Sequence, residues 1–138
     1  MKKIIFVFTF LFAATMVSAQ EVQSTESVPE DYKLTDVQYA TWKTISTNWL
    51  SDDFEKIKFE NKININCKSC YGVYMDVVIK INGSGKLEYY KVINGKNCGA
   101  AFTKQFEMRM MRSFLKFEYP PELRNVIFKT RLGTILKC

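Results

Sequence analysis

Four cysteines constrain the fold of this chain more than any other feature of its sequence. Cys67 and Cys70 form a CxxC motif, whereas Cys98 and Cys138 lie much further along the chain. A CxxC motif is typical of redox sites, of zinc sites and of structural disulfides. The chain has no histidine, which excludes Ser-His-Asp and Cys-His catalysis, mixed Cys/His zinc sites and haem attachment through CxxCH.

The first residues have the features of a secretory signal. Lys2 and Lys3 precede an uncharged apolar run over residues 4–17. Because this run is shorter than the roughly 20 apolar residues of a membrane-spanning helix, we expect a cleaved signal peptide over 1–19 and no stable membrane span. Cleavage after Ala19 places the mature chain in the periplasm or outside the cell. That compartment is oxidising, so four cysteines in a small domain predict two disulfides.

The segment after the signal divides into two parts. Residues 20–33 are mostly polar and predict a flexible leader. Residues 34–66 predict a helical N-terminal extension, in which Thr35 and Gln38 form a capping box. The net charge of +6 is typical of a solvated surface, so we expect no nucleic-acid partner. Three aromatic residues of the extension are interpreted as packing residues: Trp42, Trp49 and Phe54.

Residues 67–138 show the pattern of a ββαβ domain. Alternating apolar residues predict a strand over 73–81, and the turn sequence NGSG leads into a second strand over 86–94. Apolar residues three or four apart predict a helix over 100–117. Alternation returns in a third strand over 126–136, and the domain is therefore predicted to be α+β.

The order of these elements predicts a three-stranded antiparallel sheet. The first two strands form a hairpin, and the helix returns the chain so that the third strand runs parallel to the second. A purely antiparallel sheet then requires the first strand in the middle, in the order 2-1-3. The helix covers the apolar face of this sheet.

This topology brings all four cysteines to one end of the sheet. We expect one of Cys67 and Cys70 to bond Cys98 and the other to bond Cys138, because neighbouring strands have the spacing that disulfides need. Bonds within the CxxC and between Cys98 and Cys138 are the alternative. A reactive dithiol would open a helix, whereas this CxxC leads into a strand, and a four-cysteine zinc site needs reduced thiolates. We therefore expect structural disulfides, with no metal and no cofactor.

Residues 71–136 resemble the TonB C-terminal domain family. The resemblance rests on the hairpin "YMDVVIKINGSGKLEYYKVING", the helix "AAFTKQFEMRMMRSFLKF", the motif "EYPPE" and the strand "VIFKTRLGTIL". Gly85, Val92 and Phe117 fall where the family places them, and Pro120-Pro121 follows in the same order. This chain has Arg124-Asn125 where the family often has a glycine before the last strand.

The resemblance implies a non-catalytic interaction module of the cell envelope. In that family the domain lies in the periplasm, serves transport, and binds a segment of outer-membrane receptors by strand addition to its last strand. It therefore implies a protein or peptide partner, such as an outer-membrane receptor segment, and no enzymatic activity. Carried over to this chain, the partner-binding edge consists of Val126, Phe128, Lys129, Thr130, Arg131 and Leu132.

Two other functions stay open at this point. The first is a thiol-disulfide redox enzyme or another small envelope enzyme. Its candidate carboxylates are Asp76, Glu88 and the pair Asp52-Asp53, although their spacing matches no known catalytic arrangement. The second is a structural part of an envelope assembly that is contacted through the first helix.

Overall fold

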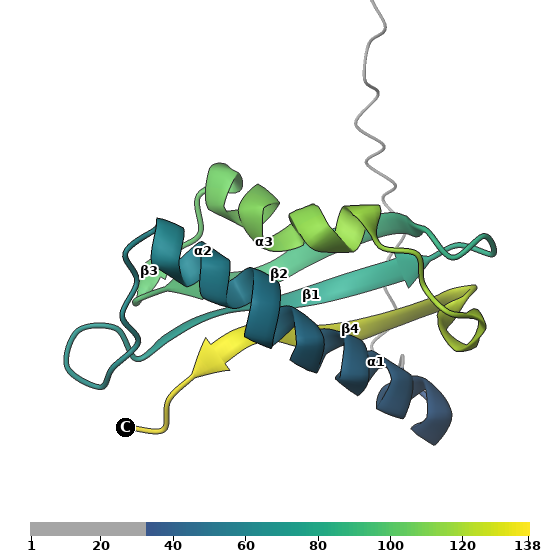
Figure 1. The fold of residues 1–138 in the computed structure, drawn as a ribbon, viewed down its shortest axis with the longest axis horizontal. Helices are drawn as coiled ribbons and strands as arrows, with labels where there is room; N and C mark the ends of the chain where they lie inside the picture. The colour runs from purple at the N-terminus through teal and green to yellow at the C-terminus, as the bar shows by residue number, and fades with distance from the viewer. Residues whose placement is uncertain (1–32) are drawn as a thin grey trace, which may run out of the picture.

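The computed structural model describes residues 33–138, which are coloured in Figure 1. The predicted signal peptide and all of the predicted leader except Lys33 lie outside the described residues. No helix in the described part of the chain is long and apolar enough to cross a membrane. The elements in chain order are α1 (Asp36–Trp49), a π-helical turn (Leu50–Phe54), α2 (Glu55–Glu60), β1 (Gly72–Ile81), β2 (Leu87–Asn97), β3 (Ala100–Ala101), α3 (Lys104–Lys116), a 3-10 turn (Pro121–Leu123) and β4 (Val126–Ile135).

The start of α1 confirms the predicted capping box. The N–H of Gln38 donates to Oγ1 of Thr35 over 3.3 Å, and the N–H of Thr35 donates to Oε1 of Gln38 over 3.0 Å. These two bonds satisfy amide groups that have no partner within the first turn of a helix. From this cap the chain stays helical through the π-helical turn and α2 as far as Glu60.

The sheet confirms the predicted α+β class and the central place of the first strand, but it has four strands instead of three. Their order is β3-β2-β1-β4, and all pairs are antiparallel. Cys98 and Gly99 have positive φ angles of 50° and 88°, so the chain reverses after β2 and Ala100–Ala101 pair back onto it. The predicted helix over 100–117 therefore starts later, after the N-cap Thr103.

The three helices lie over one face of the sheet (Figure 1). The core side chains of β1 alternate as predicted, with Val73, Met75, Val77, Ile79 and Ile81 all fully buried. Above them, the rings of the predicted packing residues are buried together with residues of α3 and β4 in one cluster. This cluster includes Trp42, Trp49, Phe54, Phe114 and Phe128. The N-terminal helices and the ββαβ segment thus share a single hydrophobic core.

Candidate functional site

The four cysteines form two disulfides at one end of the sheet, as the topology predicted. Cys70 bonds Cys98 beyond the end of β2, with a Cα–Cα separation of 4.2 Å. Cys67 bonds Cys138 beyond the end of β4, with a Cα–Cα separation of 5.6 Å. No free cysteine is found in residues 33–138. Disulfides of this kind are typical of proteins in oxidising, exported environments.

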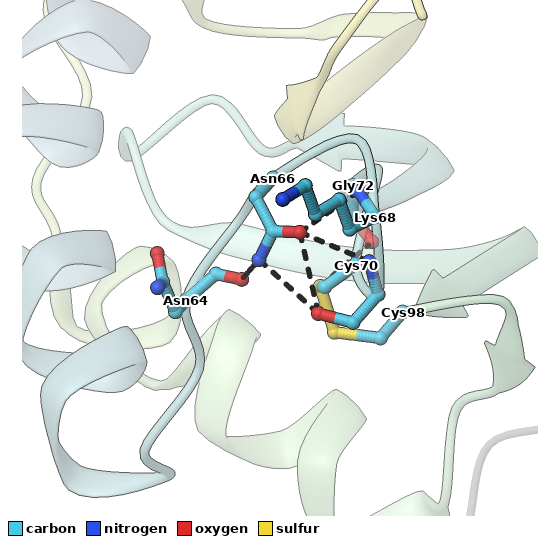
Figure 2. The surroundings of a disulfide bond; sticks show 7 residues. Asn64, Asn66, Lys68, Cys70, Gly72 and Cys98 are labelled. Carbon is cyan, nitrogen blue, oxygen red and sulfur yellow. Dashed lines mark hydrogen bonds between the residues drawn. A yellow bond between two sulfur atoms is a disulfide. The ribbon is translucent and has the colours of Figure 1, made fainter.

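The loop between Cys67 and Cys70 is held by Asn66 (Figure 2). The side-chain oxygen of Asn66 accepts the backbone N–H groups of Lys68 and Ser69, both over 2.9 Å. The backbone of Asn66 also exchanges two hydrogen bonds with that of Cys70, of 2.7 and 3.2 Å. An asparagine that hydrogen-bonds its own following backbone stabilises a tight turn. This turn lets the two cysteines of the motif bond to two different segments.

Of the six residues predicted to form the partner-binding edge, four point their side chains toward the helices. Phe128 and Leu132 are buried in the core, and Val126 packs against the same core. Thr130 accepts a hydrogen bond from Nε1 of Trp42 over 2.8 Å. These four side chains therefore stabilise the fold and are not available to a partner.

The backbone amides of β4 alternate between two directions. At the end of the strand, the N–H of Leu136 donates to the carbonyl of Tyr71 over 2.7 Å. The β1–β4 register has no shift from Gly72 to Ile81, so every second residue of β4 repeats this bond to β1. The intervening N–H groups face away from β1, where no strand lies in the described part of the chain. They belong to Ile127, Lys129, Arg131, Gly133 and Ile135.

Ile127, Gly133 and Ile135 also belong to this edge, although the predicted edge did not include them. Side chains and backbone N–H groups both alternate along a strand. The pattern that marks Phe128 as buried therefore also means that the N–H groups of its two neighbours point away from the N–H group of Phe128. The family resemblance pointed to the strand as a whole and did not separate the two directions. The free edge therefore consists of outward amides at odd positions, together with the exposed side chains of Lys129 and Arg131.

The side chain of Arg131 is held in place on the open face of the sheet. Its Nε and Nη2 donate to the two carboxylate oxygens of Asp76 over 2.8 and 3.0 Å. Its guanidinium also lies 4.9 Å from the ring centre of Tyr74. Hydrogen bonding to Asp76, followed by its charge, raises the pKa of Arg131, so this residue stays a cation. A bidentate pair and a stacked ring together fix the direction of this charge.

The opposite edge of the sheet, formed by β2, is less regular. The β1–β2 register shifts twice, which leaves Glu88 and Ile93 without a partner on β1. The bulge at Glu88 lies between Leu87 and Tyr90, where the alternation of apolar and polar residues in the sequence is interrupted. β3 also covers Lys96 and Asn97 at the end of β2. Bulges and short covering strands hinder the addition of another strand to an edge.

The candidate carboxylates do not converge on one point. Asp76 is paired with Arg131, and Glu88 forms an ion pair of 3.5 Å with Lys80. The pair Asp52-Asp53 lies in the π-helical turn, on the helical side of the molecule. Comparison with protein-family models, with curated proteins and with solved structures finds no match to this chain.

Proposed function

We propose that this chain is a non-catalytic protein-interaction module that binds an extended segment of a partner by strand addition to β4. The observation that supports this most is the terminal place of β4 in the sheet, combined with its unbroken register of ten residues. A long, regular strand with unpaired amides is a template for another strand. The bulged edge of β2 does not offer such a template.

The side chains beside this edge favour a partner that carries acidic residues. Lys129 and Arg131 are two positions apart and project from the same face of the strand. An added strand has the same period, so acidic residues at alternate positions of the partner would lie opposite these cations. Charge pairs of this kind select the register and partner more than they add affinity.

The proposed setting is the periplasm or the outside of the cell, after cleavage behind Ala19. Two disulfides support an oxidising compartment. The resemblance of residues 71–136 to the TonB C-terminal domain family suggests an outer-membrane receptor segment as the type of partner.

Amide hydrogen exchange measured residue by residue by NMR tests this proposal. The ligand is a peptide selected for binding from a displayed random library. In the free protein, the amides of Lys129 and Arg131 should exchange fast, whereas those of Phe128 and Thr130 should already be protected by β1. Bound peptide should protect the odd positions and leave the even ones unchanged. Protection that falls elsewhere, with none on the odd amides of β4, contradicts the proposal.

A pair of variants at Lys129 separates the backbone from the charge. Lys129→Pro removes an outward N–H, and proline is tolerated on an edge strand. We expect it to weaken peptide binding about tenfold, which corresponds to the loss of roughly one well-formed hydrogen bond. Lys129→Gln keeps the N–H and should weaken binding less. Equal affinity of Lys129→Pro and the unmodified chain would rule out strand addition at this position.

A further inference from the structure

A second surface with the character of a binding site lies on the helical side of the molecule. A groove of about 520 Å3 separates α2 from the C-terminal half of α3. An adjoining hollow of about 510 Å3 continues along α3 as far as Gln105 and Met108. Volumes of this size are typical of ligand sites. Together the two hollows follow the length of one helix, a shape that suits an elongated ligand.

The groove is rich in cations that form no ion pair with a carboxylate of residues 33–138. Arg109, Arg112 and Lys116 are spaced by three and four residues and therefore lie along one face of α3. Lys56 lies across the groove on α2. Among residues 33–138, no carboxylate forms an ion pair with these four side chains, and Arg109 makes a single hydrogen bond of 3.4 Å, to Asn61.

Two carboxylates, Asp53 and Glu60, also line the groove. Because four cations face these two acids, the groove has a net positive charge. An unpaired cluster of cations attracts anionic ligands over a distance and raises their local concentration.

Trp49 lies at the other end of the groove. A smaller pocket of about 220 Å3 shares Asp53, Ser113 and Phe117 with the main groove and is also lined by Trp49. Trp49 is 4% exposed, and its Nε1 has no hydrogen-bond partner in residues 33–138. Because this nitrogen is itself closed to solvent, Trp49 contributes a wall to the pocket and does not offer a donor to a ligand.

The π-helical turn that starts at Leu50 forms the wall beside Trp49. Single turns of π-helix are rare and occur frequently at functional sites, because they change the direction of side chains within a helix. Here the turn brings Asp52 and Asp53 to the same pocket as Trp49. The pocket and the cationic groove therefore belong to one continuous surface along α3.

We propose that this surface binds an extended acidic segment of another protein, with carboxylates on Arg109, Arg112 and Lys116. The seven helical steps from Arg109 to Lys116 span about 10 Å. Acidic residues at alternate positions of an extended chain are about 6–7 Å apart, so two or three carboxylates match this row of cations. The site uses no residue of β4 and does not depend on the strand-addition proposal.

Fluorescence anisotropy of a labelled octapeptide tests the site, with the exported chain as the binding protein. A peptide of alternating Glu and Ser should bind, and the binding should weaken as salt is added. A peptide of alternating Gln and Ser should bind at least tenfold more weakly. Equal binding of the two peptides overturns the proposal, because it shows that the carboxylates are not recognised.

Two double variants of equal charge locate the binding on the protein. Arg112→Gln with Lys116→Gln should weaken the Glu peptide about tenfold. Lys91→Gln with Lys96→Gln removes the same charge from the opposite face of the sheet and should change the affinity by less than about twofold. An equal loss in both double variants would mean a non-specific charge effect, and it overturns the proposal.

A competition measurement tests the ligand class. Unlabelled Glu peptide should displace the labelled peptide from the protein. Inorganic phosphate at the same concentration should displace less of the labelled peptide. If phosphate displaces as much, the site recognises phosphate and the acidic-peptide assignment is wrong.

Discussion

Nε1 of Trp42 donates a hydrogen bond of 2.8 Å to Oγ1 of Thr130, which joins α1 to β4. The ring of Trp42 also lies 4.9 Å from the ring of Phe128 in an edge-on contact and 5.8 Å from that of Phe114. The first helix is therefore tied to the strand whose outer edge we propose as the docking site. Loss of this contact would loosen β4 on its helical side.

A Trp42→Phe variant tests this link. The phenyl ring keeps much of the aromatic packing but cannot donate to Thr130, whose hydroxyl is partly buried. We expect the free energy of unfolding to fall by about 1–2 kcal/mol, since a lost hydrogen bond and lost ring area both contribute. Urea unfolding measures this change in the free energy of unfolding. A Thr130→Val variant and the double variant complete a cycle, and fully additive losses would contradict the coupling.

The two disulfides should differ in what their removal costs. Each bond constrains the unfolded chain, over 71 residues for Cys67–Cys138 and 28 for Cys70–Cys98, so loop entropy alone gives about 4 kcal/mol for each. Cys70 is 4% exposed, whereas Cys67 and Cys138 are exposed. Serine at position 70 would also bury a hydroxyl, which costs roughly 1–3 kcal/mol more if it is unpaired.

The double variant Cys70→Ser/Cys98→Ser should therefore be less stable than Cys67→Ser/Cys138→Ser. Thermal unfolding of the two variants gives the comparison. Peptide mapping of the unmodified, non-reduced chain is the control, and it should recover only peptides that link Cys67 to Cys138 and Cys70 to Cys98. A peptide closed within the CxxC would refute the pairing.

Gly133 is the glycine of β4 that we expect to tolerate no side chain. Its φ is 101°, and a Cβ there would collide with the carbonyl oxygen of Val73. Gly133→Ala should lower the free energy of unfolding by at least about 3 kcal/mol, because backbone strain and a backbone clash add together. Gly99→Ala is the matched control. Its φ of 88° is also positive, but an added Cβ meets nothing nearer than Tyr71 at 3.8 Å.

Gly99→Ala should therefore cost only about 1 kcal/mol, the contribution of the backbone conformation alone. Circular dichroism during thermal unfolding gives both values. Similar losses at the two glycines would show that the approach of β4 to Val73 is not as close as described.

Tyr119 should make the fold sensitive to alkaline pH. Its side chain is fully buried, its hydroxyl donates to the carbonyl of Phe114 over 3.3 Å, and burial raises its pKa above the usual value of about 10. Above pH 10 the unfolded chain loses this proton while the folded chain keeps it. Stability is therefore complete below about pH 10 and should fall by up to about 1.4 kcal/mol per pH unit above it.

Tyr119→Phe should cost about 1 kcal/mol at neutral pH, where a hydrogen bond is lost, and should make the alkaline fall shallower. Part of the alkaline loss of stability should persist in this variant, because burial and then the charge of Glu107 also raise the pKa of Tyr90. Tyr39→Phe, at an exposed position, is the control for the loss of a tyrosine hydroxyl and should cost less than about 0.5 kcal/mol at neutral pH. Urea unfolding at pH 8 to 11 tests the prediction, and identical profiles for Tyr119→Phe and the unmodified chain would contradict it.

The sequence by itself determined the elements with a strong period and their connection. Alternation marked β1 and β4, the capping box marked the start of α1, and the order of elements placed β1 in the middle of the sheet. These features depend on neighbouring residues and on the short connections between strands, which a single sequence records directly. For the same reason, the meeting of all four cysteines at one end of the sheet was predictable.

Only the tertiary structure decided which cysteine of the CxxC meets which strand, because the two choices differ by three residues and by no local pattern. It also decided that Trp42 reaches Thr130, that Ala100–Ala101 pair back onto β2, and that the cations of α3 lie opposite Lys56 of α2. Each of these depends on how segments far apart in the chain pack together. Side-chain volumes and backbone directions in three dimensions govern that packing, and no short stretch of residues contains them.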